Sequence, residues 1–156
     1  MSSNASTQNA VEGGFDHFRL DRKLLRGLKA LGFESPRPIQ ADTIPAALEG
    51  QDVMGLAQTG TGKTAAFGLP ILQRLIEEPG EGPLVLILAP TRELANQIDA
   101  ELRALAKFTR IETCTIFGGV PIPSQARALK RRPEIVVGCP GRVLDLVKRR
   151  MLDLSE

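Results

Sequence analysis

Residues 57–64 read Ala-Gln-Thr-Gly-Thr-Gly-Lys-Thr, between a short apolar stretch at residues 53–56 and a segment of helical spacing at about residues 63–77. The octapeptide fits the phosphate-binding P-loop pattern, with Ala57 in the place of the first glycine. A buried strand that turns through glycines into a helix is the context that this pattern requires. An ordinary glycine turn followed by a chance lysine is the alternative. The flanking elements favour a phosphate site.

Each part of this loop has a physical role in binding a phosphorylated ligand. Gly60 and Gly62 allow the backbone to curl, so that successive N–H groups point at phosphate oxygens. The N-terminus of the following helix adds its dipole to the same site. Lys63 is placed to neutralise the β- and γ-phosphates, and the Thr64 hydroxyl to bind Mg²⁺. The predicted phosphate-binding residues are Ala57, Gln58, Thr59, Gly60, Thr61, Gly62, Lys63 and Thr64.

Strands and helices alternate along the rest of the chain. Apolar runs typical of buried strands occur at residues 84–88, 111–116 and 134–137. Helical spacing follows them at residues 94–105, 124–131 and 143–148, and precedes the loop at residues 24–31 and 39–43. Pro45 and Gly50 bracket a further short turn of helix. Pro70 lies inside the helix after the loop and should kink it or leave one carbonyl without its usual donor. This alternation predicts an α/β fold with a parallel sheet covered by helices on both faces.

Length and composition indicate one globular domain. The chain has 156 residues, of which 42% are hydrophobic and 24% charged, with a net charge of +2. Residues 1–14 are rich in small polar residues, so we expect a flexible leader there. The longest apolar run, residues 84–89, is far shorter than the ~20 residues that span a bilayer. Cys114 and Cys139 stand apart from each other and form no metal-binding pattern, which favours a cytoplasmic location.

An amide and an aromatic ring upstream of the loop are candidates for recognising a base. Gln40 stands 17 residues before Ala57, after the rigid segment at residues 36–38. A glutamine amide can accept from adenine N6 and donate to N7, whereas guanine offers acceptors at both positions. Phe33 could stack on the same base. Each residue taken alone is more often structural, but together with a P-loop they favour an adenine nucleotide.

These segments resemble the motifs of the DEAD-box RNA helicases. Residues 32–40, Gly-Phe-Glu-Ser-Pro-Arg-Pro-Ile-Gln, resemble the family's Q motif, and Phe15 matches its isolated upstream aromatic residue. Residues 57–64 resemble motif I, residues 90–95 motif Ia, Gly118-Gly119 the double-glycine motif and residues 139–142 motif Ib. The resemblance implies a RecA-like P-loop fold over residues 15–156, with ATP and Mg²⁺ as cofactors and Lys63 and Thr64 as catalytic residues. It implies nucleotide contacts for Phe15, which would brace the loop, Phe33 and Gln40.

The later motifs have a physical role that agrees with the family's. Residues 90–92 and 140–142 each join a predicted strand to a helix, so they present free N–H groups, a positive helix end and an arginine. Such a set binds phosphates and sugars independently of sequence. Capping, with Arg92 and Glu93 in structural ion pairs, is the alternative. The RNA-binding residues that the resemblance implies are Pro90, Thr91, Arg92, Gly118, Gly119, Cys139, Pro140, Gly141 and Arg142, and the basic segment at residues 103–150 is consistent with them.

The chain departs from the family pattern in two places and lacks several of its parts. Arg37 stands where the family usually has threonine, which is expected to weaken support of the nucleotide loop, and Cys139 replaces the threonine that opens motif Ib. No Asp-Glu-Ala-Asp occurs. The family's water-activating glutamate, two central strands and second domain are therefore absent, and we expect the front part of a longer protein that binds ATP without efficient hydrolysis.

Two other functions stay open at this point. One is a P-loop kinase or NTPase that acts on a small molecule, in which the later motifs are accidental. The other is a non-hydrolysing fragment that binds nucleotide or RNA only. Equal affinity for GTP would favour the first, and loss of ATP binding on Lys63→Ala would argue against an RNA-binding fragment that makes no use of nucleotide.

Overall fold

The computed structural model describes residues 13–156, so most of the expected leader lies outside the described residues. The elements are η1 (Phe15–Phe18), α1 (Arg22–Ala30), α2 (Pro38–Leu48), α3 (Lys63–Glu77), β1 (Val85–Leu88), α4 (Arg92–Leu105), β2 (Thr113–Ile116), α5 (Ile122–Leu129), β3 (Ile135–Gly138) and α6 (Pro140–Lys148). No helix within residues 13–156 is long and apolar enough to cross a membrane. The alternation of helix and strand confirms the predicted α/β class.

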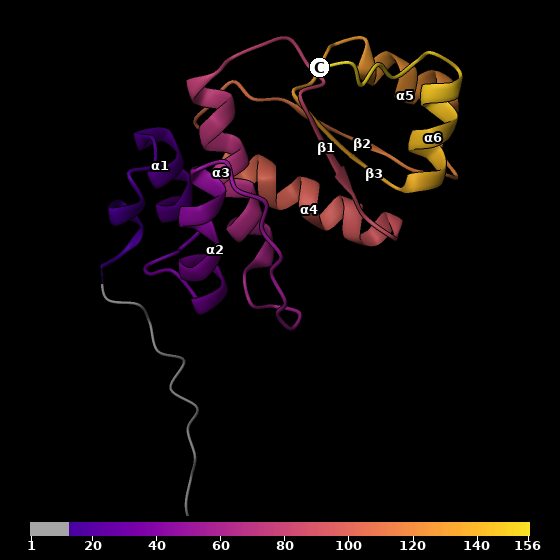
Figure 1. The fold of residues 1–156 in the computed structure, drawn as a ribbon. Helices are drawn as coiled ribbons and strands as arrows, with labels where there is room; N and C mark the ends of the chain where they lie inside the picture. The colour runs from indigo at the N-terminus through magenta and orange to yellow at the C-terminus, as the bar shows by residue number, and fades with distance from the viewer. Residues whose placement is uncertain (1–12) are drawn as a thin grey trace, which may run out of the picture.

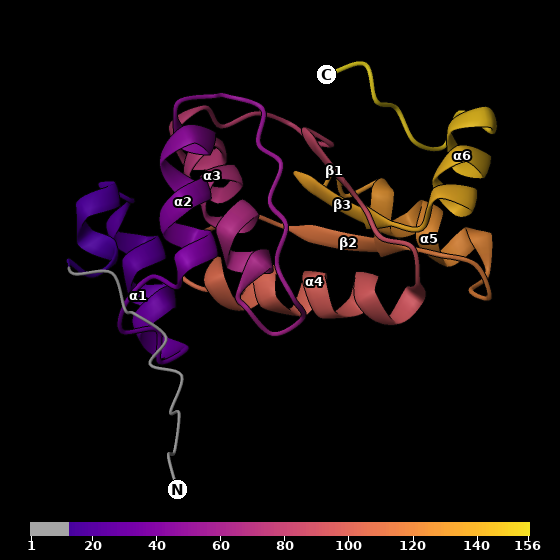
Figure 2. The ribbon, with the colours of Figure 1, turned by 60° about the horizontal axis from the view of Figure 1, so that its bottom comes forward.

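The three strands form one parallel sheet in the order β1-β3-β2. Side chains of the central strand β3 alternate between two hydrophobic clusters. Ile135 and Val137 face the cluster that contains α4, while Val136 faces the cluster formed with α5 and α6. Figures 1 and 2 show α4 along one face of the sheet and α5 and α6 on the other. Helices therefore cover both faces of β2 and β3, as predicted.

The N-terminal helices pack beside the sheet rather than on it (Figure 2). Asp21 caps α1, since its carboxylate accepts from the Lys23 N–H at 2.8 Å, and Gly32, with a φ of 76°, follows the end of the helix. The prediction of two short helical pieces at residues 39–50 was wrong, because α2 runs through Pro45 without a break. Pro45 removes one backbone hydrogen bond, but packing against α3 and complete burial of Ile44 hold the helix together.

The strand predicted at residues 53–56 does not form. Met54 and Leu56 are 88% and 89% exposed, and the segment pairs with no strand among the described residues. A strand exists only when a neighbour satisfies its backbone groups, and β1 is paired within residues 13–156 with β3 alone. The segment thus has the apolar composition of a buried strand, but no neighbouring strand among the described residues pairs with it and buries its side chains.

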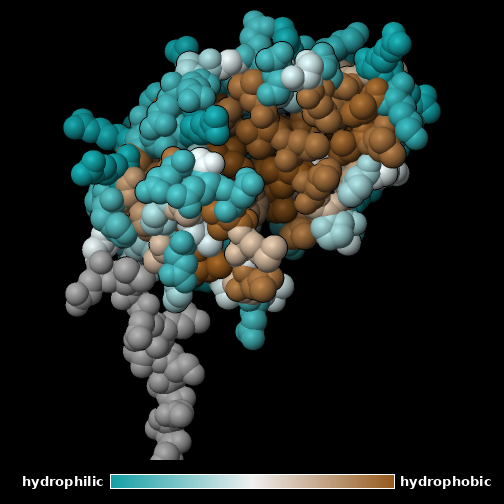
Figure 3. All heavy atoms as spheres, viewed as in Figure 1, coloured by the Kyte–Doolittle hydropathy of each residue, from teal (hydrophilic) through white to brown (hydrophobic). Residues whose placement is uncertain are grey.

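Strand β1 is also less covered than its sequence suggests. Its residues alternate between half-buried and exposed, with Leu88 55% exposed. Figure 3 shows the resulting apolar surface, which lies over the region of β1 in the view of Figure 1. The expectation of a strand covered on both faces therefore holds for β3, which is buried throughout, but not for β1.

Candidate functional site: a phosphate loop and three converging strand ends

The glycine-rich loop at residues 57–62 curls directly into the N-terminus of α3. Gly60 and Gly62 have φ angles of 77° and 85°, which side-chain-bearing residues rarely adopt. The Lys63 ammonium points back into the curl and donates to the Ala57 carbonyl at 2.6 Å. Thr61 closes the turn by donating to the Gln58 carbonyl at 2.7 Å. The sequence-predicted curl is confirmed, with its lysine folded onto the loop.

Gln40 is bound to this loop from the side of α2. The residue is completely buried, and its amide N–H donates to the Gly62 carbonyl at 3.1 Å. Its amide oxygen accepts from the Arg37 backbone N–H at 2.9 Å. A Cβ on Gly62 would lie 2.4 Å from the Gln40 amide nitrogen, so only glycine fits between them. Each end of the amide makes one hydrogen bond and keeps further capacity, but the side chain is completely buried, so a base could meet it only after the residues that cover it move.

Arg37, the N-cap residue of α2, makes a second contact to the loop. Its guanidinium donates to the Gly60 carbonyl. Three side chains thus donate to carbonyls of the loop: Arg37, Gln40 and Lys63. The residue that stands where the family usually has threonine therefore contacts the loop itself.

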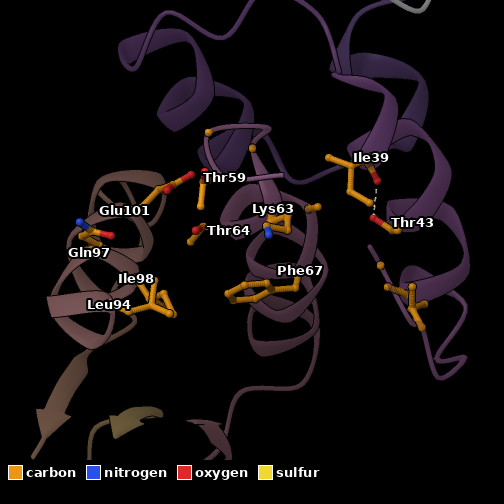
Figure 4. A pocket seen from close by; sticks show the side chains of 16 residues that line it. Ile39, Thr43, Thr59, Lys63, Thr64, Phe67, Leu94, Gln97, Ile98 and Glu101 are labelled. Carbon is orange, nitrogen blue, oxygen red and sulfur yellow. Dashed lines mark hydrogen bonds between the residues drawn. The ribbon is translucent and has the colours of Figure 1, made fainter. Parts of the chain in front are cut away.

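A cavity of about 570 Å³ opens beside the loop, between α2, α3 and α4. Figure 4 shows Lys63, Thr64 and Phe67 on α3 at its centre, with Ile39 and Thr43 of α2 on one side. Sequence reasoning missed the contribution of α4, which lines the cavity with Leu94, Gln97, Ile98 and Glu101. Their spacing of three and four residues is a signal for one helix face, but nothing in the sequence placed that face beside the loop.

The two aromatic residues expected near the base lie outside this cavity. Phe15 is 4% exposed and meets Phe33 edge to face, with ring centroids 6.0 Å apart. Both line a separate hollow of about 310 Å³ against α1. Phe33 is half-buried there, and Phe15 supports it from behind. The structure joins these two residues to each other but does not bring Phe33 to the wall of the phosphate cavity.

The ends of the three strands meet at one edge of the sheet, because all three strands run in the same direction. Pro90, Thr91 and Arg92 follow β1, Gly118 and Gly119 follow β2, and Cys139, Pro140, Gly141 and Arg142 follow β3. Pro90, Thr91, Gly118, Gly119, Pro140 and Gly141 are exposed. The sequence-predicted contact residues are thus gathered on one surface from three separate segments.

The arginines of this surface are held by neighbouring loops. The Arg92 guanidinium lies 4.8 Å from the centre of the Phe117 ring. Arg142 donates to the Val120 carbonyl at 2.8 Å and to the Gln125 side-chain oxygen at 3.1 Å, and its side chain is 16% exposed. Thr91 caps α4 by accepting from the Leu94 N–H at 3.2 Å. Among residues 13–156, neither Arg92 nor Glu93 has an ion-pair partner within 4.0 Å. The alternative that structural ion pairs occupy these two residues is therefore wrong.

Comparison with known proteins assigns the chain to a family. A family model described as DEAD/DEAH box helicase matches residues 37–156. The chain belongs to the DEAD/DEAH box helicase family. The matched residues include the phosphate loop and all three strand ends. The family that the motifs resembled is therefore confirmed.

Individual helicases agree in sequence and in fold. The ATP-dependent RNA helicase CshA of Listeria monocytogenes is 49% identical over 141 residues, or 90% of this chain. The RNA helicase Prp28 from Chaetomium thermophilum, solved bound to ADP, superposes with a TM-score of 0.83 at 43% identity over 94% of this chain. A hypothetical ATP-dependent RNA helicase from Sulfolobus tokodaii gives a TM-score of 0.79 at 34% identity over 87% of the chain. The fold is therefore the RecA-like fold of these helicases.

This chain is much shorter than the helicases that it matches. It covers 27% of CshA, 37% of the Prp28 chain and 39% of the Sulfolobus chain. The chain therefore corresponds to the N-terminal region of a DEAD/DEAH box helicase.

Proposed function

We propose that residues 15–156 are the ATP- and RNA-binding part of an ATP-dependent RNA helicase and act in the cytoplasm. One observation carries the proposal: the Gln40 amide is bonded to Gly62 of the phosphate loop, so a group able to choose adenine is joined to the groups able to hold phosphates. Movement of the loop on nucleotide binding would free that amide. The same contact would link occupation of the base site to the shape of the phosphate site.

The loop fits a nucleoside triphosphate. The positive φ angles of Gly60 and Gly62 leave the backbone N–H groups and the N-terminus of α3 available to phosphate oxygens. Lys63 would exchange the Ala57 carbonyl for the β- and γ-phosphates, a stronger charge-assisted partner. Thr64 would hold Mg²⁺, which when bound supplies charge neutralisation between the phosphates. Phe33 would stack on adenine, and Phe15 would keep the Phe33 ring in place.

The converging strand ends fit a nucleic-acid backbone. Two helix N-termini and the exposed backbone of Gly118 and Gly119 offer donors to phosphates, and Arg92 and Arg142 supply positive charge. Backbone N–H groups and arginines of this kind bind phosphates rather than base edges, so we expect binding to RNA that is independent of sequence and weakened by salt. In the whole protein this binding would be coupled to ATP hydrolysis and local separation of a duplex.

We infer that residues 1–156 alone bind ATP without hydrolysing it efficiently. Among the described residues that line the cavity, Glu101 is the one acidic side chain, and it lies on α4 rather than on the loop that follows a strand. Phosphoryl transfer depends on several positioned groups acting together. No observation favours a small-molecule P-loop NTPase over a helicase.

RNA-stimulated ATP hydrolysis and unwinding of a short duplex, measured on the protein as its gene encodes it, test this function. Lys63→Ala should abolish both activities, while Lys23→Ala, which removes an exposed lysine of α1, should leave both unchanged. Hydrolysis that does not respond to RNA, or that accepts GTP as well as ATP, would contradict the proposal.

A further inference from the structure

A buried amide joins the loops at the carboxyl ends of the strands. Gln125 of α5 is 5% exposed, although it belongs to none of the motifs that the sequence analysis identified. Its amide N–H donates to the Phe117 carbonyl at 2.8 Å, directly after β2. Its amide oxygen accepts from the Arg142 guanidinium at 3.1 Å, directly after β3. One side chain therefore connects the second strand end to the third.

The connection extends to the first strand end through Phe117. The Phe117 ring is 7% exposed, and the Arg92 guanidinium lies over it at 4.8 Å. On the other side of the double glycine, the Val120 carbonyl accepts from Arg142 at 2.8 Å. Gly118 and Gly119 are thus held at both ends, by Gln125 through Phe117 and by Arg142 through Val120.

We propose that Gln125 is a positioning residue for RNA binding, which sets the spacing of the three strand-end loops without touching RNA. This inference rests on the proposed RNA-binding function of those loops. An amide can do this because its donor and its acceptor point in opposite directions, so it fixes two partners relative to each other. Without it, the buried Phe117 carbonyl loses its hydrogen-bond partner. Arg142 loses one of its two hydrogen-bond acceptors and keeps the Val120 carbonyl and the ion pair with Asp145 at 3.9 Å.

The chain offers a matched control for the structural effect of losing a buried amide. Gln73 of α3 is 8% exposed, accepts from the Asp21 N–H at 2.7 Å and donates to the Glu77 carboxylate at 2.6 Å. Its amide oxygen therefore joins the start of α1 to α3, while its amide N–H bonds within α3. Its partners lie on α1 and α3, away from the strand ends.

The experiment compares Gln125→Met with Gln73→Met, since methionine has nearly the shape of glutamine without its polar atoms. Affinity for a labelled oligo(U) and for a mixed-sequence RNA is measured on the protein as its gene encodes it, with thermal unfolding and ATP affinity alongside. We expect Gln125→Met to lower the affinity for both RNAs about tenfold, which is equivalent to ~1.4 kcal/mol of binding free energy. ATP affinity should stay within about twofold. Gln73→Met should lower thermal stability to a similar degree and leave RNA affinity unchanged.

A double variant distinguishes positioning from general damage. If Gln125 acts partly through Arg142, the effect of Gln125→Met should fall from about tenfold to about threefold in an Arg142→Ala background. Gln125→Asn, which keeps an amide that is too short to reach both partners, should reproduce the loss and serves if the methionine variant does not fold.

Three results would overturn the inference. Folded Gln125 variants that bind RNA as the wild type does would overturn the positioning role alone. Equal losses of RNA affinity for the Gln125 and Gln73 variants would show that reduced stability, and not the position of Gln125, lowers RNA affinity. Absence of salt-dependent RNA binding by the wild-type protein would overturn the proposed function, and with it the positioning role.

Discussion

Replacing Gly62 with alanine should disrupt the nucleotide loop more than any other glycine substitution in it. Gly62 has a φ of 85°, where a Cβ costs about 1–2 kcal/mol. The added Cβ would also lie 2.4 Å from the Gln40 amide nitrogen and 3.3 Å from Arg37 Cδ. Gln40 must then move and lose its bond to Gly62, which adds about 1 kcal/mol. We expect Gly62→Ala to lower the free energy of unfolding by about 2–3 kcal/mol.

Two other glycines separate backbone strain from loss of the Gln40 contact. Gly60 and Gly50 both have a φ of 77°, and a Cβ on either meets no atom within 4 Å. Gly60 lies in the loop, whereas Gly50 follows α2. Gly50→Ala should lower stability by about 1–2 kcal/mol through strain alone and leave ATP affinity unchanged. Gly62→Ala should weaken ATP binding more than tenfold, with Gly60→Ala between the two.

Denaturant unfolding and titration with a fluorescent ATP analogue measure these effects on the same samples. At one fixed nucleotide concentration, the unfolding midpoint of Gly50→Ala should rise as much as that of the wild type, and that of Gly62→Ala should rise less. The reasoning is refuted if Gly62→Ala and Gly50→Ala bind ATP equally well, because the contact between Gln40 and the loop would then have no part in binding.

Three further changes test other parts of the account. Gln40→Ala should reduce discrimination of ATP against GTP by about 1–3 kcal/mol, measured by competition, and an unchanged ratio would remove Gln40 from base selection. Arg142→Ala should weaken RNA binding equally for all sequences and flatten its dependence on salt, which a sequence-selective loss would contradict. Burial, and then the Asp99 carboxylate, raise the pKa of the Cys114 thiol from 9.0 to about 11. Because folding favours the protonated thiol, the free energy of unfolding should fall as the pH rises from 9 to 11, and Cys114→Ala should remove that part of the pH profile.

Local signals allowed most helices to be predicted from the sequence. Asp21 and Thr91 each cap the helix that follows, because the side-chain oxygen of a capping residue bonds to a nearby backbone N–H of the same chain segment. The α3 helix begins at Lys63 and passes through Pro70 as expected. Such contacts depend on residues two to four positions apart, and the sequence contains that information directly.

Features that depend on distant partners were not predictable in the same way. Residues 53–56 have the composition of a strand, yet whether they form one depends on a neighbour that the local pattern does not specify. The continuity of α2 through Pro45 depends likewise on packing against α3, which outweighs the local preference to stop.

The candidate site was predicted in its motifs but not in its connections. Spacing and residue type identified Gln40 and the loop, but not that each end of the Gln40 amide makes a hydrogen bond. Gln125 gave no signal at all, since a single glutamine in a short helix is ordinarily a surface residue, and only the fold shows it to be buried between two strand ends. The contact of Arg37 with the Gly60 carbonyl was likewise not predicted, because the residue type does not show which backbone group a long side chain reaches.

Magnesium-dependent binding of ATP is the most direct test of the account. Equilibrium dialysis of the protein as its gene encodes it should show retention of ATP that requires Mg²⁺, exceeds retention of GTP and is lost on Lys63→Ala but not on Lys23→Ala. Retention that is independent of Mg²⁺ and of Lys63, or no retention of ATP at all, would contradict the assignment of residues 57–64 as the nucleotide site.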